Sequence, residues 1–279
     1  MVPGPKIMGI LNVTPDSFSD GGAFLAPADA VKQALQMEKE GADIIDIGGE
    51  SSRPGSQSIS IEEELKRIIP VVQELRRQSQ IAISIDTTKS LVAARALEAG
   101  ATMINDISAG LGDPEMFFVA AKYQVPVCLM HMQGKPQTMQ NSPHYDDVVE
   151  EVKRFLALRI EVAVKTGIPK NKIIIDPGIG FGKRLGDNIA LLKNCDRFQG
   201  LGCPILIGAS RKSFIGQITG APVQDRLPGS LAATAIATQK GASILRVHDV
   251  AATKNFLLVF SVDIRLQNHF YNPFFLCCS

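Results

Sequence analysis

The segment at residues 81–89, with the sequence IAISIDTTK, decides the fold of this chain. Its apolar run at residues 81–85 is too short for a helix and rich in β-branched residues, so we predict a buried strand. The strand stops at the carboxylate of Asp86, and an alanine-rich helical run starts at Lys89. The basic unit is therefore a strand, a polar turn and a helix.

The same unit recurs along the chain. Further apolar runs at residues 43–47, 102–104 and 173–175 stop at Gly48, at Asn105 and Asp106, and at Asp176. Core packing would favour apolar residues at strand ends, because buried carboxylates need partners. A ring of strand ends around one ligand explains the polar residues better.

Sustained alternation of strands and helices covers most of the chain. Strands are predicted at residues 6–11, 43–47, 81–85, 102–104, 125–130, 173–175, 204–207 and 243–247. Helices are predicted at residues 28–40, 62–78, 89–99, 114–123, 146–165, 187–195, 229–239 and 249–265, with Gly41, Gly100, Gly167 and Gly241 as helix ends. Eight such units predict a parallel sheet closed into a single (β/α)8 TIM barrel, with an open doubly wound sheet as the alternative. Long polar loops at residues 12–22 and 48–55 follow the first two strands.

The composition excludes several classes of protein. The 279 residues are 45% hydrophobic and carry a formal net charge of +1, so no bulk charge favours nucleic acid or an anionic membrane. Five cysteines show no metal-type spacing, and Cys128 and Cys203 are interpreted as core thiols. We found no export signal and no apolar run of about 18 residues, so we expect a cytoplasmic protein.

Cationic residues follow the last two predicted strands. Arg211 and Lys212 follow the seventh strand, and Arg246 and His248 bracket the end of the eighth. Barrel loops at these positions frequently bind phosphate, for which Arg and Lys are suited. Arg246 lies within an apolar run and needs an anionic partner. For Arg211, a surface cation and a phosphate ligand are equally good interpretations.

Hydrogen-bond acceptors follow the middle strands. Asp86, Asn105 and Asp176 suit a ligand with adjacent N–H donors, such as an aminopyrimidinone edge, or a divalent metal. The spacing of these residues is compatible with either ligand. The metal is less favoured, because no His or Glu lies close to these residues in the sequence. Asp46 is also open, and one interpretation is that it orients the loop at residues 51–53. Asp43 and Asp106 fit structural acceptors equally well.

At this point several motifs, in order along the chain, resemble those of the dihydropteroate synthase family. They are NVTPDSFSDGG at residues 12–22, DIGGESSRPG at 46–55, SIDT at 84–87, ND at 105–106, DPGIGFGK at 176–183, SRKS at 210–213 and RVHD at 246–249. The resemblance spans roughly residues 6–253.

The resemblance implies an Mg²⁺-dependent transferase of folate biosynthesis. It would condense (7,8-dihydropterin-6-yl)methyl diphosphate with 4-aminobenzoate, giving 7,8-dihydropteroate and diphosphate, with sulfonamides as competitors. The implied pterin-binding residues are Asp86, Asn105, Asp176 and Lys212. The implied diphosphate-binding residues are Asn12, Arg53, Arg246 and His248, with Asn12 also a metal ligand. The implied 4-aminobenzoate site is Ser52, Arg53, Pro54, Phe181 and Ser213. The implied catalytic set is Lys212, Arg246, His248 and Asp86. The family also suggests a homodimer through the late helices.

Two features complete the expectations. We expect the barrel to span residues 1–267, and the aromatic segment at residues 268–279, which carries Cys277 and Cys278 near its end, departs from the family pattern. Among other functions, a pterin-binding methyl carrier would need no diphosphate site, and a catalytically dead barrel should have lost one of the polar groups. A sugar-phosphate isomerase barrel would need a Glu or Lys base at a strand end, and none is evident.

Overall fold

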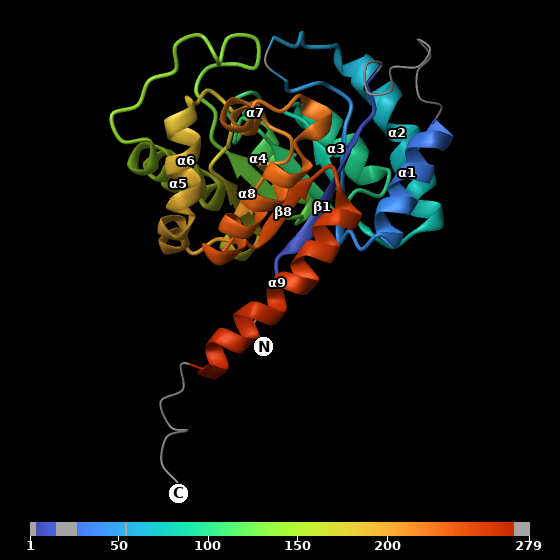
Figure 1. The fold of residues 1–279 in the computed structure, drawn as a ribbon. Helices are drawn as coiled ribbons and strands as arrows, with labels where there is room; N and C mark the ends of the chain where they lie inside the picture. Colours follow the sequence, from blue (N-terminus) through green and yellow to red (C-terminus); the bar gives the residue numbers. More distant parts are fainter. Residues whose placement is uncertain (1–3, 15–26, 54, 271–279) are drawn as a thin grey trace, which may run out of the picture.

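The computed structural model describes residues 4–14, 27–53 and 55–270, with side chains up to residue 261. Eight parallel strands form one sheet in the order β6-β5-β4-β3-β2-β1-β8-β7. An additional parallel bridge joins Ile175 to Ile205, so the chain before β7 meets β6 and the barrel closes. The predicted (β/α)8 barrel is confirmed, and helices surround it (Figure 1).

The elements alternate almost as predicted. The strands are β1 (Lys6–Asn12), β2 (Ile44–Gly48), β3 (Ala82–Asp86), β4 (Met103–Asp106), β5 (Val127–Met130), β6 (Ile173–Asp176), β7 (Leu206–Ile207) and β8 (Ile244–Val247). The α-helices are α1 (Pro27–Lys39), α2 (Ile61–Gln78), α3 (Ser90–Glu98), α4 (Met116–Tyr123), α5 (Val148–Lys165), α6 (Leu185–Lys193), α7 (Ser213–Thr219), α8 (Leu227–Gln239) and α9 (Val250–Phe270). Short 3-10 helices lie at η2 (Lys170–Lys172), η3 (Cys195–Leu201) and η4 (Val223–Asp225).

The structure differs from the sequence prediction at some element ends and in one additional helix. β3, β4 and β6 include the polar residues that were expected just after them, so these side chains belong to the strands. α7 was not predicted, because it has only 7 residues and contains Gly216. α9 was expected to end at residue 265, but it continues to Phe270 and projects away from the barrel (Figure 1).

Glycines end four helices as predicted. Gly41, Gly100, Gly167 and Gly241 follow α1, α3, α5 and α8 with φ values of 99°, 116°, 102° and 84°. In this left-handed region a Cβ is disfavoured, so glycine lets the chain turn from each helix toward the next strand.

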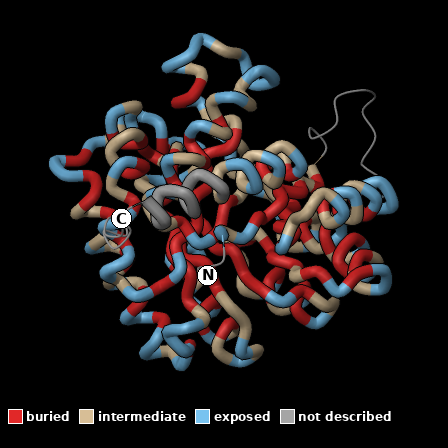
Figure 2. Tube along the Cα trace, turned by 60° about the horizontal axis from the view of Figure 1, so that its bottom comes forward, coloured by how far each residue is buried: buried red, intermediate tan, exposed pale blue. Residues whose placement is uncertain are grey.

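The hydrophobic core has two parts. The larger part lies between the sheet and the helices, and Figure 2 shows buried segments running through the centre of the molecule. The smaller part fills the barrel near the beginnings of the strands and consists of Met8, Ile44, Met103, Cys128, Ile174, Leu206 and Ile244. The barrel interior is therefore apolar at its amino end and polar at its carboxyl end. Cys128, Cys195 and Cys203 are free and buried, as expected of core thiols.

No helix in the described part of the chain has the length and apolar character needed to cross a membrane.

Candidate active site at the carboxyl ends of the strands

Strand register brings the predicted acceptors together. Asp86 pairs with Gly48 of β2 on one side and with Asn105 of β4 on the other. Asp176 is the last residue of β6 and pairs with Met130 of β5. Parallel strands end at one rim of a barrel, so residues far apart in sequence share one polar end.

An ion-pair network crosses this end. Arg246 donates from Nε to Oδ2 of Asp46 at 2.6 Å and from Nη2 to Oδ2 of Asp86 at 2.7 Å. Asn105 donates from Nδ2 to the same oxygen of Asp46 at 3.0 Å. The expectation that Asp46 orients the loop at residues 51–53 is wrong. Its carboxylate points into the barrel, where a buried cation needs a counter-charge.

Burial shapes the electrostatics of this network. Burial raises the pKa of Asp86 to about 7, against the opposing effect of Arg246, and Asp46, Glu64 and Asp106 raise it further. The nearby carboxylates Asp46 and Asp86 outweigh burial and raise the pKa of Arg246, which stays charged. The anionic partner predicted for Arg246 is thus a pair of carboxylates within the chain.

A second cluster joins β6 to the turn before α7. Asp176 accepts at Oδ1 from the backbone N–H of Gly178 at 2.7 Å. The ammonium of Lys212 donates to the carbonyl of Ile179 and lies 4.4 Å from the centroid of the Phe181 ring. Burial lowers the pKa of Lys212 to about 8, although Asp176 opposes this shift.

Gly180 lets Lys212 reach this position. It has φ +83°, and a Cβ there would lie 2.9 Å from Cδ of Lys212. The loop after β6 therefore needs glycine at this position for conformation and for space.

His248 sits beside the cations at the end of β8. Its Nδ1 lies 3.0 Å from Oγ of Ser210, and its backbone N–H donates to the same oxygen at 3.2 Å. Burial lowers the pKa of His248 to about 4, and Arg246 and Arg211 lower it further. The imidazole is therefore neutral near pH 7, so His248 offers hydrogen bonds rather than a formal charge. Arg211 forms a bidentate ion pair with Asp249, with its Nε at 2.9 Å, so this cation has a carboxylate partner.

The loop after β2 is tied to the end of β3. Lys89 forms ion pairs with Glu50 of the loop and, at 2.6 Å, with Glu64 of α2. Arg67 donates to the carbonyl of Gly49 at 2.9 Å. Arg53 is exposed but lies near enough to lower the pKa of His248.

For the other predicted site residues the structure gives a position in the fold but few contacts, or they lie outside the described residues. Asn12 ends β1 opposite Gly48, and Ser213 is the exposed first residue of α7. Pro54 and residues 15–22 of the first long polar loop lie outside the described residues. Asp43 and Asp106 are structural acceptors. Asp43 accepts from Ile7 N at 2.8 Å, and Asp106 accepts from its own loop.

Sequence reasoning missed a buried polar group near the site. Lys183 lies 3.0 Å from Nδ1 of His131 and donates to the carbonyl of Phe181 at 2.9 Å. Burial lowers the pKa of Lys183 to about 7 and that of His131 to about 3. A lysine that ends a glycine-rich loop was the available signal, but nothing in its spacing indicates burial.

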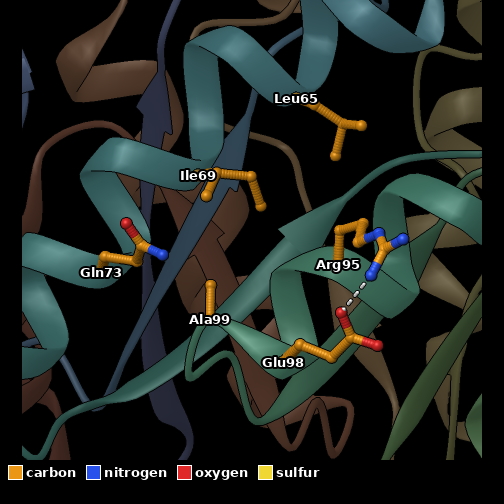
Figure 3. Close-up of a pocket in the computed structure, with 6 residues that line it drawn as sticks. All are labelled: Leu65, Ile69, Gln73, Arg95, Glu98 and Ala99. Carbon is orange, nitrogen blue, oxygen red and sulfur yellow. Dashed lines mark hydrogen bonds and ion pairs between the residues drawn. The ribbon is translucent and has the colours of Figure 1, made fainter.

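A surface hollow of about 290 Å³ lies elsewhere, between α2 and α3 (Figure 3). It is lined by Leu65, Ile69, Gln73, Arg95, Glu98 and Ala99. Arg95 and Glu98 form an ion pair along α3 on one side of it, and none of the predicted site residues lines it.

Comparison with known proteins agrees with the motifs. The family model described as pterin binding enzyme matches residues 8–248. The dihydropteroate synthase of Escherichia coli K12 is 50% identical over 249 residues, which cover 89% of this chain and 88% of that protein. The chain belongs to the dihydropteroate synthase family. The Haemophilus influenzae dihydropteroate synthase is 49% identical over 91% of this chain and 92% of its own length.

Solved structures of dihydropteroate synthases share the fold. A Yersinia pestis dihydropteroate synthase in a sulfonamide drug complex has a TM-score of 0.90 and 46% identity, over 94% of this chain and 95% of that one. A Xanthomonas albilineans dihydropteroate synthase with 4-aminobenzoic acid has a TM-score of 0.87 and 49% identity, over 95% and 93%. Another from X. albilineans, in complex with 7,8-dihydropteroate, has a TM-score of 0.84 and 46% identity, over 94% of each chain. Family, fold and transferase activity expected from the motifs are confirmed.

Proposed function

We propose that this chain condenses (7,8-dihydropterin-6-yl)methyl diphosphate with 4-aminobenzoate at the carboxyl end of its barrel. The observation that carries the proposal is the convergence of Asp86, Asn105, Asp176 and Lys212 on one rim, in a chain of the dihydropteroate synthase family. Relatives of similar sequence have been solved with 4-aminobenzoic acid and with 7,8-dihydropteroate, which supports the same substrate and product here. Sulfonamides would compete for the 4-aminobenzoate position.

The acceptors would bind the pterin ring. Asp86, Asn105 and Asp176 are largely buried, so their hydrogen bonds are protected from competing water. They would accept from ring N–H and amino groups, and Lys212 would donate to the ring carbonyl and to N5. These contacts hold the exocyclic methylene in a fixed position, which is the orientation term in catalysis.

The basic side of the site would hold the diphosphate. Arg246 carries the charge, neutral His248 donates a hydrogen bond, and Arg53 approaches from the loop after β2. When the C–O bond to the diphosphate breaks, negative charge grows on the leaving oxygen, and these groups stabilise it. The methylene left behind is electron-poor, so the weakly basic arylamine attacks it without a strong general base and then loses a proton.

The residues present suit a Mg²⁺ ion that is held mainly by the substrate. The described residues contain no group of three or more His, Cys, Asp or Glu side chains placed to hold a metal ion. Asn12, at the end of β1, offers a hard amide oxygen, which fits an ion shared with substrate phosphates and water. When bound in this way, Mg²⁺ supplies positive charge at the leaving diphosphate.

The second substrate would lie beside Phe181. Ser52, Arg53, Pro54 and Ser213 would complete its site, with Arg53 facing the carboxylate of 4-aminobenzoate. The described part of the loop after β2 would help to exclude water, which otherwise hydrolyses the activated methylene.

Diphosphate release tests this proposal. Wild type, Lys212→Ala and the exposed control Lys193→Ala are assayed with the pterin diphosphate, with and without 4-aminobenzoate and Mg²⁺. We expect release that requires both additions, collapses in Lys212→Ala and persists in Lys193→Ala. Reduced-pterin binding without release would instead indicate a pterin-binding carrier module.

We also propose a homodimer formed through the late helices. Ile218, Val223 and Ile236 are apolar and 58%, 52% and 40% exposed on α7, η4 and α8, which supports an apolar contact there. Analytical ultracentrifugation of wild type and Ile218→Glu tests it, because a monomer in both would contradict the proposal. Cytoplasmic location stays a prediction, which cell fractionation would check.

A further inference from the structure

Asp46 occupies an unusual position within the proposed site. It lies on β2 inside the barrel, its side chain is 0% exposed, and the loop-orienting role interpreted from the sequence is not the one it has. One of its oxygens, Oδ2, accepts from both Arg246 Nε at 2.6 Å and Asn105 Nδ2 at 3.0 Å. A single carboxylate oxygen thus connects a residue of the diphosphate side with a residue of the pterin side.

The bonds of Asp46 determine what its two partners can present. Because Asn105 donates its amide nitrogen to Asp46, its carbonyl oxygen is turned away from Asp46 and remains an acceptor. Because Arg246 uses Nε on Asp46 and one Nη on Asp86, its guanidinium plane is fixed, and its other N–H groups keep a defined direction.

Charge gives Asp46 a second effect. The side chain of Arg246 is only 17% exposed, so its charge needs compensation, and Asp86 is its other carboxylate partner. With Asp46 present, Asp86 does not neutralise Arg246 alone and keeps acceptor capacity for a ligand. Without it, Arg246 would bind Asp86 more tightly and compete with the pterin ring.

We propose, on the basis of the function proposed above, that Asp46 is a positioning residue that acts through Arg246 and Asn105 to couple the pterin and diphosphate sides of the site. It need not touch either substrate. Its effect is to set the direction of two side chains that would do so.

Asp106 provides a matched comparison. It is also 0% exposed at a strand end, but its carboxylate accepts from the backbone N–H groups of Ser108 at 2.8 Å and Gly110 at 2.6 Å. Those bonds shape the turn after β4 and reach no site residue. A purely structural carboxylate at this rim is expected to behave like Asp106.

Steady-state kinetics and thermal unfolding of Asp46→Asn and Asp106→Asn distinguish the two roles. For Asp46→Asn we expect the KM for pterin diphosphate to rise about 10- to 100-fold, the range for a lost charged hydrogen bond. The KM for 4-aminobenzoate should stay within about twofold, because neither partner belongs to its side. Asp106→Asn should lower Tm and change the KM for pterin diphosphate far less than Asp46→Asn does, because its charge acts on Asp86 only through space and none of its bonds reaches a site residue. An unchanged pterin diphosphate KM in folded Asp46→Asn would overturn the proposal.

A double-mutant cycle tests the route through Arg246. Arg246→Met and Asp46→Asn/Arg246→Met are compared by kcat/KM for pterin diphosphate. We expect the two variants to have nearly equal kcat/KM values, because Asp46 cannot act through Arg246 once that residue is replaced. Any remaining difference would be the effect that Asp46 exerts through Asn105. If the double variant lost kcat/KM by the product of the two single-variant factors, the inference would be overturned. Asp86 loses its cation in both Arg246→Met and the double variant, so they differ only at Asp46, and the comparison stands even if Asp46→Asn alone does not fold. Wild type without arylamine-dependent release would refute the proposed function separately.

Discussion

The ammonium of Lys212 lies 4.4 Å from the centroid of the Phe181 ring. One of these residues is proposed for the pterin ring and the other for 4-aminobenzoate, so the two halves of the site are in direct contact. The ring also covers an ammonium whose pKa burial has lowered to about 8. Changes at Phe181 are therefore expected to affect both substrates.

Phe181→Leu should raise the KM for 4-aminobenzoate and, less strongly, that for pterin diphosphate. The cation–π contact is partly buried and worth about 1–2 kcal/mol, which corresponds to about 5- to 30-fold. Steady-state kinetics with each substrate varied in turn would measure both effects. Tyr123→Leu is the control, because Lys122 lies 5.3 Å from the Tyr123 ring in a similar but exposed contact. Equal effects of both variants would contradict the assignment.

Lys89→Met should destabilise the protein and loosen the loop after β2. Glu64 is 1% exposed, and loss of its ammonium partner leaves a buried charge at a cost of about 3 kcal/mol. With Glu50 no longer paired to Lys89, the loop that carries Arg53 should hold 4-aminobenzoate less well. Urea unfolding and the two KM values would test this.

The exposed pair of Arg95 and Glu98 is the control for Lys89. Their side chains are 58% and 47% exposed, so Arg95→Met should cost less than about 1 kcal/mol and change neither KM. In Lys89→Met/Glu64→Leu the stability should recover while 4-aminobenzoate binding stays weak. Recovery of both together would mean that the ion pair does not position the loop.

Stability should fall in acid partly because of His131. Burial and the neighbouring Lys183 lower the pKa of His131 from 6.5 to about 3 in the folded protein. Between these pH values the unfolded chain binds a proton that the folded protein does not, so the free energy of unfolding falls as pH drops from 6.5 toward 3. His131→Gln should lose less stability over this window. Thermal unfolding at several pH values, with the 74% exposed His144→Gln as control, would check this.

Substitutions on the far part of α9 should have little effect on stability. Leu258 and Val259 are 57% and 74% exposed, whereas Leu257 packs against the core. Val259→Lys should change the free energy of unfolding by less than about 0.5 kcal/mol. Leu257→Ala should cost about 1–2 kcal/mol, less than a fully buried leucine. A large loss in Val259→Lys, measured by urea unfolding, would indicate that this face is covered by a partner.

Strand–helix alternation and helix-ending glycines were readable from the sequence because they depend on local properties. Residues 81–89 contain a buried strand, an acceptor and the start of a helix, and the structure has all three. α7 was missed because a 7-residue helix with an internal glycine has no clear apolar period. The two hydrogen bonds that Asp46 accepts were missed because their donors, Asn105 and Arg246, are 59 and 200 residues away in the sequence.

The sequence by itself determined the order of strands and helices, the family and the residue types at the strand ends. These follow from local propensity and from motifs that are contiguous in the chain. Only the tertiary structure decided which of those residues share a hydrogen bond or a charge. Barrel closure brings β2, β3, β4 and β8 around one interior, and there the dielectric and the available partners, rather than the neighbours in sequence, determine what each side chain does.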